Sequence, residues 1–348
     1  MQTIIPIAKY DETAKRFIKN INPDERLKAL SKITTVVISN EDDEHFDYIL
    51  FANGNRAKDV THDGTHPFER RDYCQRIADY FRSKGKNVLI ESVLLDNDSP
   101  LSIETMLIAD YLDDIASEET LDTINVIGHS KCGAMAFNLP KYFNNEDSFR
   151  KTSITTTATP YKGCLMATPT KFLRQVEAIT DAQLPKPLNR IVFNSLKNYY
   201  NSINSGSHMD NDIALPGYVA ERYDPSFISD MFDIENISAI NRVRKFRNFT
   251  TRVDNDTLMK YLRKGDFTSV GMCLIDKFFM DEPTDGFIET DSQESVNDHF
   301  DHPSTHIPST THYFLTHPDE MAVVLDAVNS DIDDYKDREA FKQKISSF

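Results

Sequence analysis

The sequence predicts an α/β fold in which a mostly parallel central sheet is covered by helices on both faces. Two observations support this prediction. Short β-branched or apolar runs alternate along the chain with longer segments in which apolar residues recur at helical spacing. The strand-like runs are apolar almost throughout, which is typical of strands buried on both faces of a parallel sheet. At 348 residues, the chain is long enough for one such core with an insertion.

The expected elements follow one another regularly through the first half of the chain. Residues 9–31 contain two helical pieces that are expected to pack on the outside. The expected strands are runs rich in β-branched and aromatic residues, at residues 33–38, 48–52, 87–95, 124–127 and 152–157. The expected helices have apolar residues along one side, at residues 68–82, from Pro100 to Ile115 and from Gly133 onward. Ligands of such sheets bind at the carboxyl ends of the strands.

The regular alternation ends near the middle of the chain. Residues 164–265 contain helical pieces, at 169–179 and 189–200, that alternate with loops. Because a segment of this length is too long for a connection within a compact sheet, we interpret it as an inserted helical cap or lid. Its apolar side chains are expected to form the core of the cap and in part to line a pocket. The cap would divide the core into residues 1–163 and 266–348.

Beyond the cap, the sheet is expected to resume between Phe267 and Met280. A loop is expected at residues 281–286, which contain a proline and a glycine, and a short strand at 305–308. Two final helices are expected, at 318–328 with apolar residues facing inward and at 332–345 with mostly charged residues. These elements complete the expected sheet and its covering layers.

The most specific motif of the chain is a strand, a tight turn and the start of a helix around Ser130. A β-branched run stops at Gly128, and small residues that can start a helix follow from Gly133. In a turn of this kind, a serine is held in a strained backbone conformation with its hydroxyl above the carboxyl end of the sheet. The usual pattern is G-x-S-x-G, and Cys132 stands here where the second glycine is usual.

Composition argues against several kinds of partner. The chain carries 39 basic and 55 acidic residues, a net charge of −16, and no basic run, so neither a nucleic acid nor an anionic membrane surface is expected. No segment approaches the roughly 18 uninterrupted apolar residues of a membrane span, and the first ten residues lack the basic leader of a secretory signal. We therefore expect a cytoplasmic protein without an integral membrane segment. Export by a signal-independent route is left open.

The cysteines do not form a recognisable site in the sequence. They are Cys74, Cys132, Cys164 and Cys273. Because they lie far apart without a C-x-x-C pair, they predict reduced thiols and neither a zinc site nor a redox motif. No metal and no organic cofactor is expected.

Three further segments follow the serine motif in a recognisable order. They are Thr157–Gly163 with the pattern T-P-x-x-G, Thr284–Ile288 with D-G followed by apolar residues, and Thr311–Pro318 with a histidine ahead of the last helices. Together with Val126–Lys131, these segments resemble the lipase and esterase branch of the α/β-hydrolase family, in which a serine, an acid and a histidine follow in this order. The resemblance covers residues 46–165 and 280–328, and not the cap.

The resemblance implies a serine hydrolase that cleaves carboxylic esters through an acyl-enzyme. The hydroxyl of Ser130 would attack the acyl carbon of the substrate. His312 would accept the hydroxyl proton and later deliver it to the leaving alcohol. Asp285 would fix the imidazole tautomer and stabilise the imidazolium.

The mechanism also requires two backbone N–H groups that stabilise the developing oxyanion. One is the N–H after the nucleophile, which belongs to Lys131, and the other is expected at Asn55, after the strand at 48–52. In the family this second loop begins with His-Gly, whereas here it begins with Asn53 and Gly54. The donor is a backbone group, so the departure leaves the mechanism possible.

Other histidines and acids compete for these roles. The rival histidines are His299, His302, His306 and His317. His312 is preferred because it lies just past the expected strand, whereas His317 precedes a helix whose positive N-terminal dipole disfavours an imidazolium. The rival acids form clusters typical of solvated loops, and they are Asp281, Glu282, Asp291, Asp298 and Asp301. Asp285 is preferred because Gly286 lets its loop turn toward the histidine.

The substrate is predicted less specifically than the chemistry. Apolar residues of the cap favour a fatty acyl ester, either a small molecule or a lipid. An acyltransferase would use the same acyl-enzyme, and the sequence does not separate the two reactions. A catalytically inactive hydrolase fold that serves as a binding module is a third interpretation, favoured by Cys132 and Asn53 but opposed by the ordered serine, acid and histidine. The oligomeric state is left open.

Overall fold

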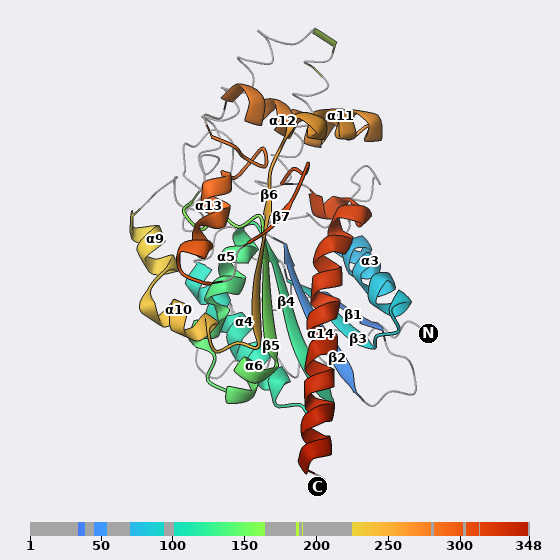
Figure 1. Cartoon of the computed structure of the whole chain (residues 1–348), viewed down its shortest axis with the longest axis vertical. Coiled ribbons are helices and arrows are strands. Elements are labelled where there is room, and N and C mark those ends of the chain that lie inside the picture. Colours follow the sequence, from blue (N-terminus) through green and yellow to red (C-terminus); the bar gives the residue numbers. More distant parts are fainter. Residues whose placement is uncertain are drawn as a thin grey trace.

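The computed structural model confirms the predicted α/β fold with a mostly parallel sheet between two layers of helices (Figure 1). It describes ten stretches of the chain, which are residues 34–38, 45–53, 70–93, 101–163, 186–187, 190, 225–279, 282–301, 304–312 and 314–346. The helical pieces predicted at 9–31, 169–179 and 189–200 lie outside the described residues, apart from residue 190. In the described part of the chain, no helix is both long enough and apolar enough to cross a membrane.

Within the described stretches, the sheet has seven strands in the order β1-β3-β2-β4-β5-β6-β7. Their bounds are β1 Thr34–Ile38, β2 Phe46–Asn53, β3 Val88–Val93, β4 Leu121–His129, β5 Thr152–Thr157, β6 Lys245–Thr251 and β7 Thr305–Ile307. Strand β1 runs antiparallel to β3, and every other neighbouring pair is parallel. The carboxyl ends of six strands therefore meet at one edge of the sheet, where ligands of parallel sheets bind.

The helices form the two outer layers and a group beyond the carboxyl ends of the strands (Figure 1). Their bounds are α3 Arg70–Ser83, α4 Leu101–Ala116, α5 Lys131–Asn138, α6 Glu146–Lys151, α9 Pro225–Met231, α10 Ile234–Ile240, α11 Asn255–Lys264, α12 Phe267–Phe279, α13 Thr290–Glu294 and α14 Pro318–Ser346. Short 3-10 turns lie at Leu139–Tyr142, Ser295–Asp298 and Phe314–Thr316. Helices α3 and α14 cover one face of the sheet, α4, α5 and α6 cover the other, and α11 and α12 lie above the carboxyl edge.

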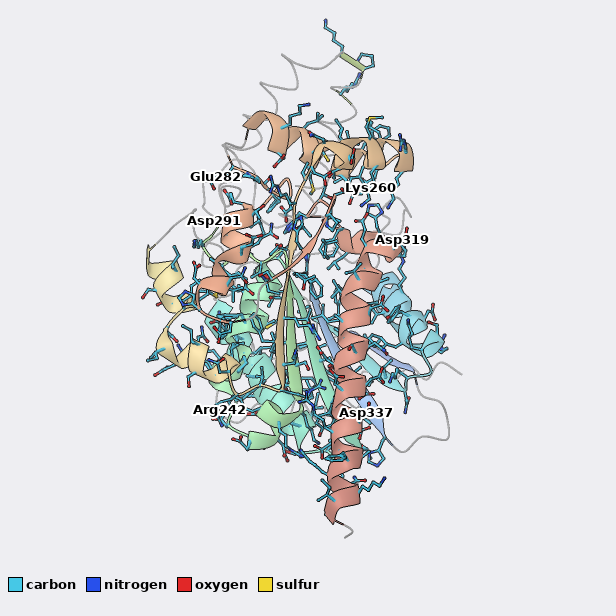
Figure 2. The ribbon with its side chains drawn as sticks, viewed as in Figure 1. Arg242, Lys260, Glu282, Asp291, Asp319 and Asp337 are labelled. Atoms are coloured by element: carbon cyan, nitrogen blue, oxygen red, sulfur yellow. The ribbon has the colours of Figure 1, made fainter. Side chains whose placement is uncertain are left out.

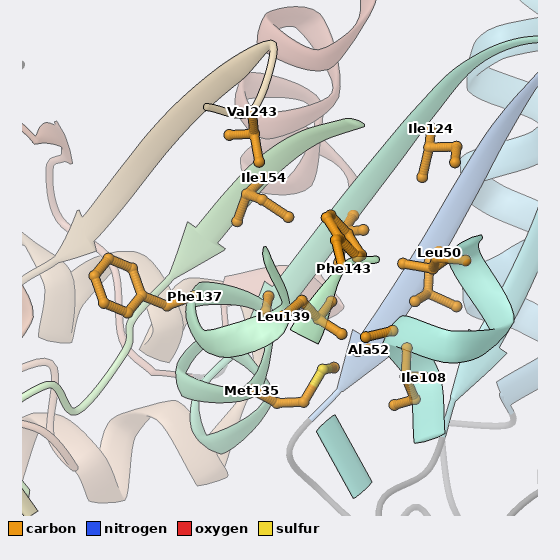
Figure 3. Packing of buried hydrophobic residues seen from close by; sticks show 14 of the residues in the cluster. Leu50, Ala52, Ile108, Ile124, Met135, Phe137, Leu139, Phe143, Ile154 and Val243 are labelled. Atoms are coloured by element: carbon orange, nitrogen blue, oxygen red, sulfur yellow. The ribbon is translucent and has the colours of Figure 1, made fainter. Parts of the chain in front are cut away.

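Each face of the sheet has its own hydrophobic core, because successive side chains of a strand point to opposite faces. Tyr48 and Leu50 of β2 pack with α4 and α5, whereas Ile49 and Phe51 pack with α3 and α14. Figure 3 shows part of the first core, in which Leu50 and Ala52 of β2 lie near Ile108 of α4 and Met135 of α5. Strand β2 is buried on both faces and is mostly apolar, as the sequence indicates, whereas the equally buried β5 reads Thr-Ser-Ile-Thr-Thr-Thr.

The second half of the chain departs from the prediction in three places. The sheet resumes at Lys245, inside residues 164–265, so the predicted cap boundary at 265 is wrong. Residues 267–280, predicted to contain the resuming strand, instead form α12 over Phe267–Phe279. The two predicted final helices are one continuous helix, α14.

These errors have physical reasons. Strand β6 reads Lys-Phe-Arg-Asn-Phe-Thr-Thr, and some of its polar side chains have distant partners, as in the two-point pairing of Arg247 with buried Asp331. The apolar run of α12 fits a short strand as well as a helix by periodicity. Asp331 lies where α14 was expected to break, and its pairing with β6 stabilises the helix there.

A buried carboxylic acid lies in the core between β2, β3 and α4. Glu91 is 1% exposed and accepts hydrogen bonds from the hydroxyls of Tyr48, at 2.6 Å, and Tyr111, at 2.6 and 2.8 Å to its two oxygens. Burial raises the pKa of Glu91 from its ordinary 4.5 to about 8, although the hydrogen bond from Tyr111 acts in the opposite direction. Because the folded pKa is the higher one, unfolding releases a proton between these values. The contribution of Glu91 to stability is therefore complete below pH 4.5 and is lost as the pH rises through 8.

We expect Glu91→Gln to remove this pH dependence, because an amide accepts hydrogen bonds and does not ionise. In the wild type, Glu91 should lower the free energy of unfolding by up to about 1.4 kcal/mol per pH unit in this interval. Chemical denaturation between about pH 5 and pH 8 measures the slope. Replacing the exposed Glu119 by glutamine is the control and should leave the slope as in the wild type. Equal slopes in the wild type and Glu91→Gln would contradict the prediction.

Candidate active site

Ser130 lies in the turn between β4 and α5, in the predicted strand, turn and helix. Its backbone has φ 57° and ψ −129°, a conformation that is strained for any residue other than glycine. The turn is held by hydrogen bonds from Ser130 N to Thr157 O, at 2.9 Å, and from Gly133 N to Ser130 O, at 2.8 Å. Ser130 thus lies at the carboxyl end of a central strand, where the sequence predicts the nucleophile.

Two glycines let α5 start close to β4 and to the turn after β5. A Cβ atom added at Gly128 would lie 2.3 Å from the carbonyl oxygen of Cys132, and one at Gly133 would lie 1.8 Å from Oγ1 of Thr159. The contact with Gly128 is made by the backbone of Cys132, while the Cys132 residue is fully buried in the core beside α4. The cysteine therefore fits where the usual motif has glycine.

Asp285 and His312 are hydrogen-bonded to each other in the interior of the protein. Oδ2 of Asp285 and Nδ1 of His312 are 2.9 Å apart, and the residues are 0% and 1% exposed. An ionised carboxylate only accepts hydrogen bonds, so Nδ1 carries the proton in this pair. The backbone also joins the two residues, from His312 N to Asp285 O at 2.8 Å. Nε2 of His312 is buried and has no hydrogen-bond partner among the described residues.

The loop of Asp285 turns at Gly286, which has φ 88°. Oδ1 of Asp285 accepts hydrogen bonds from the backbone N–H groups of Phe287, at 2.9 Å, and Ile288, at 2.7 Å. A side chain at position 286 would also collide with α12, because its Cβ would lie 2.4 Å from Cβ of Met272. Gly286 thus permits both the turn and the packing.

The ring of His312 lies between two other aromatic rings, one of which was not anticipated. Phe287 stacks on it at 4.9 Å between ring centroids with an interplanar angle of 19°, and His129 lies at 4.7 Å and 36°. His129 immediately precedes Ser130, so this contact brings the serine turn and the histidine loop together. Burial, and next the charge of His312, hold the pKa of His129 well below its ordinary value of 6.5, against weaker hydrogen bonding to backbone groups. In the sequence, the contact of His129 with His312 could have been suspected only from the position of His129 in the motif, directly before Ser130.

Helices α11 and α12 hold the loop that carries His312. Oγ of Ser309 donates to Asp254 at 2.6 Å, Nζ of Lys260 donates to the Ser309 carbonyl at 2.8 Å, and the hydroxyls of Ser269 and Thr311 are 3.0 Å apart. Lys260 also extends from α11 to the start of α14, where it pairs with a buried glutamate (Figure 2). Sequence reasoning missed these contacts because it assigned this region to the cap and to a strand.

The rival histidines have other surroundings. His317 pairs with Asp266 at 2.9 Å at the start of α14, and His306 is exposed in β7. His299 is exposed and stacks on Phe232. His302 lies outside the described residues.

The rival acids are exposed where they are described. These are Glu282, Asp291, Asp298 and Asp301, whereas Asp281 lies outside the described residues. Asp291 is 3.3 Å from Nζ of Lys162, and Figure 2 shows Asp291 and Glu282 on the outer side of the molecule. Among the predicted candidates that are described, Asp285 and His312 are the acid and the histidine that form a buried pair.

Of the two predicted oxyanion donors, the structure describes Lys131. Lys131 is the first residue of α5 and directly follows Ser130, so its N–H group belongs to the first turn of that helix. Asn53 ends β2 and pairs in register with His129, at the same edge of the sheet. Asn55 and Gly54 lie outside the described residues.

Comparisons with known proteins find similar folds and no similar sequences. No protein-family model and no curated protein matches the chain. The mature lipase BlEst2 of Bacillus licheniformis is 12% identical, with 85% of this chain and 97% of that chain covered and a TM-score of 0.46. Est1E of Butyrivibrio proteoclasticus is 8% identical, with coverages of 87% and 94% and a TM-score of 0.43. An esterase B of Lactobacillus rhamnosis is 10% identical, with 97% of each chain covered and a TM-score of 0.38.

At these identities the likeness concerns the fold alone. The parallel sheet with helices on both faces and the strained serine at the end of a central strand, both seen in this chain itself, agree with the predicted α/β-hydrolase fold. The function is therefore inferred below from the residues of this chain.

We expect Gly133→Ala to destabilise the protein by about 1–3 kcal/mol, because its new methyl group would overlap the Thr159 side chain. Replacing Thr159 by alanine in the same molecule removes Oγ1 and should recover part of this loss. Denaturant unfolding of the two single variants and the double variant measures the coupling. Additive effects in the double variant would show that the two side chains do not meet.

Proposed function

We propose that the protein is a serine hydrolase that cleaves carboxylic esters through an acyl-enzyme on Ser130. The observation that supports this most strongly is the joint geometry of three elements. A strained serine ends β4, a buried carboxylate and imidazole are hydrogen-bonded, and the free nitrogen of that imidazole is buried without a partner among the described residues. A hydroxyl is a weak nucleophile, and a base with an orienting acid is the arrangement that activates it.

In the proposed reaction, Oγ of Ser130 attacks the carbonyl carbon while Nε2 of His312 accepts the hydroxyl proton. The negative charge of Asp285 stabilises the imidazolium that forms. The tetrahedral intermediate expels the alcohol, which takes the proton from Nε2 and leaves an acyl-enzyme. Water then repeats the sequence at the acyl carbon, so that the acid is released and the Ser130 hydroxyl is restored.

The oxyanion of this reaction would form beside the start of α5. The N–H group of Lys131 is one proposed donor, and that of Asn55 is the other. The first turn of a helix carries backbone N–H groups that point outward along the helix axis and the positive end of the helix dipole. Both features stabilise a negative charge that develops next to Ser130.

For the substrate, we propose an ester with an apolar acyl group. The basis is the apolar composition of residues 164–244, most of which lie outside the described residues. In this segment, Met231 and Phe232 pack against the hydrophobic core on the face of the sheet that α4 and α5 cover. They are therefore core residues and are not proposed to line a pocket. Acyl transfer in place of hydrolysis would use the same serine, and products formed with an added alcohol would reveal it.

Ser130→Ala is expected to abolish hydrolysis of p-nitrophenyl esters and labelling by a fluorophosphonate, because both need the serine hydroxyl. Cys132→Ala should keep activity within about tenfold of the wild type, because the thiol is buried in the core. Esters of increasing chain length should give a Ser130-dependent optimum at medium or long chains.

Three outcomes would count against these expectations. Turnover that survives Ser130→Ala but not Cys132→Ala would mean that the nucleophile is wrong. A wild type that reacts with neither probe would favour the inactive binding module. A rate that falls steadily from acetate would contradict the apolar acyl group while leaving the serine chemistry intact.

His312→Gln and Asp285→Asn should each lower kcat by about a thousandfold or more and change KM far less, because the base and its acid act in the transition state. His317→Gln is the matched control. Its amide can keep the hydrogen bond to Asp266, and its kcat should stay within about threefold of the wild type. Steady-state kinetics of the three variants on one ester measures these changes in kcat and KM. Equal losses of kcat in His312→Gln and His317→Gln would refute the assignment of the base.

A further inference from the structure

The carboxylate of Asp285 has more hydrogen-bond donors than its pairing with His312 requires. Its Oδ1 is taken by the two backbone N–H groups of its own loop. Its Oδ2 accepts from His312 and also from the hydroxyl of Thr251, at 2.9 Å, and from Nε2 of Gln293, at 3.1 Å. Thr251 and Gln293 are both fully buried. Two polar side chains from other elements are therefore directed at the oxygen that holds the imidazole.

Gln293 connects the acid to the end of the sheet. Its Oε1 accepts the N–H of Thr251 at 2.8 Å, and its Nε2 donates to the Thr251 carbonyl at 3.2 Å, as a neighbouring strand would. The two N–H protons of Nε2 are shared among three acceptors, because Oδ2 of Asp285 and the carbonyl of Ile288 each lie 3.1 Å from it as well. Gln293 comes from α13, so one amide joins α13, β6 and the loop of the acid.

Thr251 approaches the same oxygen from the strand itself. Its hydroxyl has one proton and two acceptors, Oδ2 of Asp285 at 2.9 Å and Oε1 of Gln293 at 3.3 Å. The shorter contact leads to a charged acceptor, so the proton is assigned to the carboxylate. Strand β6 also pairs with β7, where Thr251 lies opposite Ile307, and β7 leads into the loop of His312.

We propose that Thr251 and Gln293 are positioning residues that hold Oδ2 of Asp285 against Nδ1 of His312. A carboxylate held only by its own loop at Oδ1 and by His312 at Oδ2 can still shift together with the imidazole, whereas donors from β6 and α13 fix Oδ2 relative to the sheet. The donors also stabilise the charge of a carboxylate that is removed from water. His312 is thereby kept as the Nδ1–H tautomer, with Nε2 as the acceptor. The inference rests on the proposed function only for its effect on turnover.

The test compares Thr251→Val, which removes the hydroxyl at nearly constant shape, with Thr251→Ser, which keeps it. Gln293→Leu removes both amide groups and serves as a second variant. Thr250→Val is the matched control, because the Thr250 hydroxyl lies 3.3 Å from Nδ1 of His306 and is not among the hydrogen-bond donors to Asp285 in the described part of the chain. Ester kinetics measure kcat and KM, and nitrogen NMR of the imidazole reports the tautomer of His312 without any substrate.

Thr251→Val and Gln293→Leu should lower kcat by about tenfold with KM within about twofold, and the Nε2–H tautomer of His312 should appear in both. Thr251→Ser and Thr250→Val should match the wild type in both measurements. If Gln293→Leu does not fold, the comparison of Thr251→Val with Thr251→Ser still tests the proposal. Wild-type tautomer and kcat in Thr251→Val would overturn the proposal, and so would a change in KM alone. If the wild type lacks Ser130-dependent turnover, the proposed function fails, while the tautomer measurement still tests the positioning role.

Discussion

The close contact between α5 and β4 is the constraint on which the geometry of the site depends. The helix approaches the strand so nearly that a methyl group at Gly128 would overlap the backbone of Cys132. Because the helix starts so close to the end of the strand, the chain must reverse direction within a single residue. That residue is Ser130, which adopts the positive φ that the reversal requires. The strain is offset by the burial of Met135 and Phe137 from α5 in the core. The serine is therefore held in place by the packing of the whole sheet.

The acid and the histidine reach the same edge by a different route, through hydrogen-bonded loops. Residues 252–284 separate β6 from Asp285, and the helices α11 and α12 that they contain bind the His312 loop at Ser309 and Thr311. Thr251, at the end of β6, is tied to α13 through Gln293. A segment that the sequence analysis divided between an inserted cap and a strand of the sheet thus forms two helices that support the loop of His312.

The sequence predicts the elements whose pattern is local. The turn around Ser130 is predicted by the apolar run of β4, by its glycine and by the small residues of α5. The turn of the Asp285 loop is predicted by the glycine that follows it. The hydrogen bond between Asp285 and His312 is observed, whereas the catalytic roles of these two residues and of Ser130 are predictions. Elements stabilised by distant partners could not be found in this way. Strand β6 carries charged residues that need Asp331, and α12 has an apolar run that fits either period. The role proposed for Gln293 depends on contacts between α13 and β6, which no local pattern indicates.

The rings of His129 and His312 lie close together, with centroids 4.7 Å apart, so a positive charge on His312 disfavours one on His129. His129 is buried and hydrogen-bonded to Thr157, and the positive charge of a protonated His312 is one of the causes that keep the pKa of His129 low. A proton taken up by His312 therefore makes a second one on the adjacent ring less favourable. In the proposed reaction, a proton that His312 accepts from Ser130 would therefore remain on His312, the ring that is hydrogen-bonded to Asp285, and would be available to the leaving group.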